Sequence, residues 1–153
     1  MMTLELRLWI EKNRDLVWDA LRMYLGLALF VKGLAYLATP NELAAIMESH
    51  HVPLASSALA KYVAATHVAG GLALAFGVFT RLAALIQIPN VLGALLYVHL
   101  GNGLFSPAQT LELDALVLVI LTLFAAGGAG RFSVDWSFER HAPTVAQPVP
   151  LPT

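Results

Sequence analysis

The sequence predicts an all-α membrane protein: a bundle of four transmembrane helices with a short interfacial helix on its outer side. Hydrophobic residues fill 58% of the 153 positions and charged residues only 12%, whereas soluble domains carry about 25% charged residues. A soluble domain of about 150 residues still exposes roughly a third of its unfolded surface, so it could not shield this much apolar surface from water. The apolar residues also gather into four long runs, which lipid can solvate.

Four runs are long enough to be spans, because about 20 apolar residues cross the hydrocarbon core of a bilayer as a helix. The expected spans are residues 16–38, 58–79, 82–100 and 111–129. The first is the weakest, since Arg22 and Lys32 interrupt it. The segment ahead of it is too acidic and too long for the start of a signal peptide, so we expect this span in the mature protein.

The segments between and beyond the spans carry signals of their own. Residues 39–42, TPNE, form a capping box with proline at the first helical position. The helix that they open is too short to cross the bilayer and should lie in the outer interface. The tail at 142–153 has four prolines and no hydrophobic stripe. We therefore expect a cytoplasmic N-terminal segment at 1–15, the transmembrane domain at 16–136 and a flexible cytoplasmic tail at 137–153.

Loop cations predict the orientation, because lysine and arginine in short loops favour the cytoplasmic side. The two outer connections, 39–57 and 101–110, contain neither residue. We expect cytoplasmic N and C termini in a bacterial-type inner membrane. All loop cations of the four-span arrangement then share the cytoplasmic side: Arg7, Lys12, Arg14, Arg81, Arg131 and Arg140.

Composition also excludes several function classes. The chain has no cysteine, which removes disulfides, thiolate metal sites and thioester chemistry. The net charge is −1 with no basic stripe, so no nucleic-acid partner is expected. No metal site is expected either, because no zinc spacing occurs and the adjacent His50 and His51 diverge by about 100° on a helix. His67 and His99 lie at different depths, which disfavours haem ligation by the two histidines.

Polar side chains inside spans are functional-site hypotheses, because lipid does not solvate them. Lys32 lies about 15 Å deeper than Arg22, since it follows ten residues later on the same helix. Arg22 and Lys61 can also be explained as side chains that extend to the interface. His67 is as readily a hydrogen-bonded packing residue as a proton-transfer or ligand-binding one. The candidates are Arg22, Lys32, His67, Asn90, His99 and Glu112.

Helical angles give these candidates directions. On span three, His99 falls about opposite Asn90 unless Pro89 bends the helix. On span four, Glu112 and Asp114 lie about 200° apart, so only one of them can face inward. We expect Glu112 to face inward and to pair with Lys32 of span one, with Asp114 nearer the headgroups.

On span one, Arg22, Gly26, Gly33 and Tyr36 share one face. Small residues on such a face let a neighbouring helix approach closely. The sequence therefore predicts a close helix contact along this stripe.

Five stretches of the chain, taken together, resemble the DoxX family. They are LRMYLGLALFVKGLAYLATP, HVAGGLALAFGVFTRLAAL, YVHLGNGLF, LELDALVLVI and GAGRFSVDW, and they follow the family's order over about residues 20–136. The resemblance implies a four-helix membrane protein of a family named after a subunit of an archaeal thiosulfate:quinone oxidoreductase. Other members are thought to act as membrane partners in redox or oxidative-stress assemblies. Members commonly carry an acidic residue where this chain has His67, so a mechanism that needs a carboxylate there is not expected.

These observations favour a small integral membrane subunit that anchors or serves a redox complex. It would have no intrinsic cofactor, and a quinone would contact it where His99, Glu112 and Lys32 supply polar groups beside an apolar slot. Two alternatives stay open: a purely structural subunit, whose buried charges fix helix register, and a small proton-coupled transporter. The expected partners are the lipid bilayer and either other subunits or a second copy. A stand-alone enzyme is not expected, because the sequence offers no set of nucleophile, base and orienting residue.

Because the chain has no cysteine, single introduced cysteines can report its topology directly. Cysteines at Ala45 and Phe105 should react with a membrane-impermeant maleimide added outside intact cells, since both positions lie in the outer connections. Labelling of both positions only from the cytoplasmic face would contradict the orientation.

Overall fold

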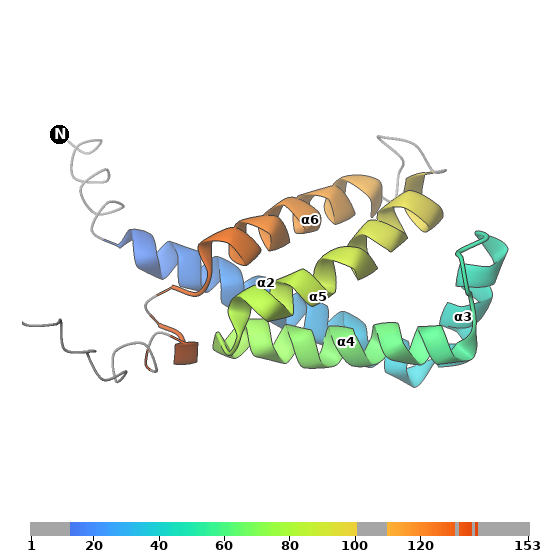
Figure 1. Ribbon diagram of the computed structural model, residues 1–153, viewed down its shortest axis with the longest axis horizontal. Helices are drawn as coiled ribbons and strands as arrows, with labels where there is room; N and C mark the ends of the chain where they lie inside the picture. Colours follow the sequence, from blue (N-terminus) through green and yellow to red (C-terminus); the bar gives the residue numbers. More distant parts are fainter. Residues whose placement is uncertain (1–12, 101–109, 131, 136, 138–153) are drawn as a thin grey trace, which may run out of the picture.

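The computed structural model describes residues 13–100, 110–130, 132–135 and 137. All secondary-structure elements in these residues are helices (Figure 1). Residues 1–12 of the predicted N-terminal segment, most of the predicted tail and residues 101–109 of the outer connection lie outside the described residues. The helices in chain order are α2 (Arg14–Ala38), α3 (Pro40–Ser49), α4 (Ser57–Phe76), α5 (Thr80–Gly93), the π-helix η1 (Ala94–His99) and α6 (Thr110–Gly127).

The predicted four-span architecture is confirmed. Among the described residues, the stretches long and apolar enough to cross a membrane are Asp15–Ala38, Ser57–Phe76, Thr80–His99 and Thr110–Gly127. The short helix α3 lies at one end of the elongated bundle, and the turn between α4 and α5 lies at the other (Figure 1). We call these ends the α3 end and the turn end.

Helices α2 and α4 pack backbone against backbone. A methyl group added at Gly26 of α2 would lie 2.3 Å from the backbone nitrogen of Ala75, and one at Gly71 of α4 would lie 2.5 Å from that of Phe30. Gly33 meets the backbone of Val68 in the same way. The glycine stripe predicted for the first span therefore forms this contact, and it fixes how far α2 can slide along α4.

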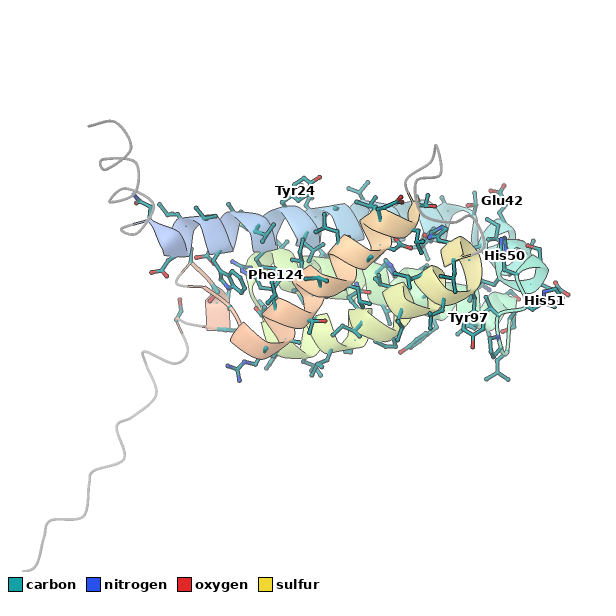
Figure 2. The ribbon with its side chains drawn as sticks, turned by 90° about the horizontal axis from the view of Figure 1, so that it is seen from above. Tyr24, Glu42, His50, His51, Tyr97 and Phe124 are labelled. Carbon is teal, nitrogen blue, oxygen red and sulfur yellow. The ribbon has the colours of Figure 1, made fainter. Side chains whose placement is uncertain are left out.

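Large apolar side chains fill the space between α2, α4, α5 and α6. Phe124 points between the helices, whereas Tyr24 points outward from α2 (Figure 2). Many large apolar side chains are also exposed on the outside of the helices, where a bilayer can solvate them. The fully or nearly buried apolar core comprises Leu25, Leu29, Leu74, Ala83, Ala84, Val91, Leu121 and Phe124.

A buried arginine closes the turn end. The Arg22 side chain is 0% exposed and forms an ion pair with Asp19, with 3.1 Å between Nη2 and Oδ1. Its guanidinium also donates hydrogen bonds to the carbonyls of Leu74 and Ala75, near the C-terminus of α4, and of Phe132. The Leu74 and Ala75 carbonyls, at the C-terminus of α4, carry partial negative charge and so stabilise the cation inside the protein. The Arg22 side chain is therefore enclosed by the protein.

The segment that follows α6 caps helix α5. The Asp135 carboxylate accepts hydrogen bonds from the backbone N–H groups of Phe79 (2.7 Å) and Thr80 (2.8 Å), where α5 begins. The carboxylate of Asp19 accepts one from the N–H of Phe132 at 2.9 Å. The FSVD sequence at 132–135 thus joins α2, α5 and α6 at the turn end.

The α2–α4 contact predicts a stability difference between two glycine-to-alanine variants. Gly71→Ala should lower the free energy of unfolding by about 1–3 kcal/mol, because its methyl group meets backbone that cannot move aside. Gly93→Ala is the matched control, since a methyl group there has nothing within 4 Å. Denaturant unfolding in detergent would measure both, and equal stability of the two variants would contradict the packing.

A candidate ligand-binding cavity at the α3 end

A cavity of about 340 Å³ lies at the α3 end, between α2, α4 and the α5–η1 helix, with α3 beside it. Its volume is in the lower range for small-molecule sites. The apolar face of α3 contributes Leu43, Ile46 and Met47 to the lining. The polar or ionisable residues of the lining are Lys32, Tyr36, His67, Asn90, His99 and Asp114.

Asp114 of α6 organises one wall of the cavity. It is 4% exposed, and its carboxylate accepts a hydrogen bond from Nδ1 of His99 on η1, with 2.5 Å between the two atoms. Its other oxygen lies 3.8 Å from Nζ of Lys32 on α2. One carboxylate therefore connects three helices, and the ammonium group of Lys32, whose side chain is 41% exposed, offsets part of its negative charge.

The π-helix directs His99 to this wall. A π-helix has i→i+5 hydrogen bonds and turns by roughly 80° per residue, whereas an α-helix turns by about 100°. Over the six residues Ala94–His99 the difference rotates His99 by roughly 100° relative to a continuous α-helix. His99 and Asn90 therefore line the same cavity, and the expectation that they face opposite sides is wrong for this reason.

His67 lies on the α4 side of the cavity and is 4% exposed. Its Nδ1 lies 2.9 Å from the carbonyl oxygen of Val63 one turn earlier. Because a carbonyl only accepts, Nδ1 carries the proton, and Nε2 of the neutral ring is an acceptor. The ring meets Tyr36 edge-on with centroids 5.6 Å apart, and Nζ of Lys32 lies 5.9 Å from the centre of the Tyr36 ring.

A polar network joins α4 to α5 beside the cavity. The Thr66 hydroxyl donates to carbonyls of its own helix and accepts a hydrogen bond of 2.8 Å from Nδ2 of Asn90. Nε2 of Gln87, which is fully buried, donates to the Thr66 carbonyl oxygen over 3.1 Å. These bonds hold Asn90 in one orientation at the cavity edge.

Comparison with known proteins places the chain in a family. The family model described as DoxX matches residues 17–100, more than half of the 153 residues. The chain belongs to the DoxX family. No curated protein and no solved structure matches it. The matched segment contains every polar residue of the cavity except Asp114.

Four of the six predicted polar candidates of this DoxX-family chain meet at the cavity: Lys32, His67, Asn90 and His99. Arg22 does not, because it lies at the turn end among Asp19 and backbone carbonyls.

The choice between the two acids of span four is wrong. Asp114 is the buried one and pairs with Lys32, whereas Glu112 is half-buried and does not line the cavity. The reason lies in the helix period: Asp114 is in register with Leu121 and Phe124 of the core, seven and ten residues later. Glu112 is in register with Leu116 and Val119, which are both more than half exposed.

Sequence reasoning also missed residues that hold the site. Gln87 gave a signal that could have been used, since it lies three residues before Asn90 on the same helix face. Thr66 gave none, because a threonine in a span usually bonds its own helix. Outside the cavity, Lys61, His50 and His51 are exposed, as expected for interfacial residues.

Proposed function

We propose that this DoxX-family protein is a small membrane subunit of a redox complex and that it binds the headgroup of a quinone in the cavity at the α3 end. The observation that carries the proposal is the lining of that cavity, whose residues are apolar apart from Lys32, Tyr36, His67, Asn90, His99 and Asp114. A quinone headgroup is a flat apolar ring with two polar oxygens, so it needs such a lining.

Each part of the lining has a distinct role in the proposed complex. The ammonium group of Lys32 donates a hydrogen bond to one ring oxygen, and Asp114 keeps that group at the cavity while balancing its charge. Met47 of α3 and Val91 of α5, both buried, contact the ring. The long apolar tail of a quinone extends into lipid, which the exposed apolar surface of the helices adjoins.

Electrons for a bound quinone would come from a partner subunit. The chain has no cysteine and therefore lacks the usual ligands of an iron–sulfur cluster. A companion that carries a flavin or a haem is the expected electron carrier, and purification in mild detergent from the native membrane should recover it. This is why we propose a subunit rather than a complete oxidoreductase.

A cavity-filling variant tests quinone binding. Gly93 lines the cavity, and a Cβ atom added there has nothing within 4 Å, so Gly93→Phe should fold and occupy the headgroup position. A benzoquinone with a decyl tail should bind the purified wild-type chain, measured by equilibrium dialysis in detergent, and Gly93→Phe should weaken binding by at least about tenfold.

Leu92→Phe is the matched control, because the neighbouring Leu92 is 38% exposed on the lipid side and does not line the cavity. It should bind like the wild type. Equal binding by Gly93→Phe, or no saturable binding by the wild type, would contradict the proposal and favour a purely structural subunit.

A further inference from the structure

We propose that the cavity binds the reduced, hydroxyl-bearing form of the ring in preference to the quinone. The inference rests on the proposed function and concerns the redox state of the ligand. Three residues that line the cavity, Asn90, His67 and His99, already use hydrogen-bond donors within the protein. We infer the preference from the polar atoms that these residues have left for a ligand.

Asn90 has only an acceptor left. The hydroxyl hydrogen of Thr66 is used on carbonyls of its own helix, so the Thr66 oxygen must accept from the Asn90 amide nitrogen. That contact fixes which end of the amide is nitrogen. The second hydrogen of the same nitrogen is directed to Oε1 of Gln87 over 3.5 Å. The remaining polar atom of Asn90 is Oδ1, which only accepts.

The two histidines give the same result. Nδ1 of His67 donates to the Val63 carbonyl, which leaves Nε2 as an acceptor on the neutral ring. In the neutral form of His99, Nδ1 donates its hydrogen to the Asp114 carboxylate. Its Nε2 is then also an acceptor.

The donors at the cavity are fewer. Lys32 donates, but part of its capacity is directed to Asp114, and the Tyr36 hydroxyl can donate or accept. A quinone offers only carbonyl acceptors, so it would leave the acceptors of Asn90, His67 and His99 without partners. A hydroquinone offers two hydroxyl donors. Buried polar groups left without a partner cost more than a hydrogen bond contributes, so the hydroquinone should bind more tightly.

The test compares the two redox forms of one ligand. Binding of decyl-benzoquinone and of the corresponding hydroquinone to the purified full chain would be measured anaerobically by equilibrium dialysis. We expect the hydroquinone to bind about tenfold more tightly, as two additional hydrogen bonds would give. In His67→Phe, which keeps an aromatic ring beside Tyr36 but removes an acceptor, the ratio of the two affinities should fall at least about threefold.

His50→Phe is the matched control, because His50 is exposed on α3 and should leave the ratio unchanged. Asn90→Leu is a second variant for the same ratio if His67→Phe does not fold. Equal affinities of the two redox forms, or tighter binding of the quinone, would overturn this inference and leave the proposed function standing. Failure of both forms to bind would overturn both.

Discussion

The carboxylate of Asp114 is the constraint on which the α3 end of this membrane protein depends. A charge in the hydrocarbon region must be balanced within the protein, because lipid offers neither water nor counter-ions. Asp114 therefore holds Lys32 of α2 and His99 of η1 close to α6. Because those helices meet at one carboxylate, the space that they enclose is lined by polar groups on one side and by α3 on another.

The turn end also balances a buried charge within the protein. Arg22 is surrounded by Asp19 and by backbone carbonyls of α4 and of the segment after α6, so its charge is satisfied by neighbours that also close the bundle. Between the two ends, the glycine contact of α2 with α4 sets the axial positions of Arg22 and Lys32. Buried charge is thus balanced at both ends of the bundle, and at the α3 end the balanced charges lie beside a cavity.

The sequence predicted most of the fold, because hydrophobic run length and small-residue stripes are local properties. It predicted the site in part, since Lys32, His67, Asn90 and His99 were recognised by their depth alone. Two features depended on more than depth. Asp114 required the register of α6 with its core leucine and phenylalanine, and the orientation of His99 required a π-helix, which periodicity at about 100° per residue does not reveal.

The central claim, that the charge of Asp114 is held between Lys32 and His99, is tested most directly by a double-mutant cycle. Lys32→Met, Asp114→Asn and the double variant would be unfolded in detergent, with Lys61→Met as the control for loss of an exposed lysine. The asparagine keeps the size of the side chain and removes only its charge. The free energy of unfolding of the double variant should be about 1 kcal/mol higher than the sum of the two single losses predicts. Strictly additive losses would show that Lys32 and Asp114 do not interact and would contradict the account.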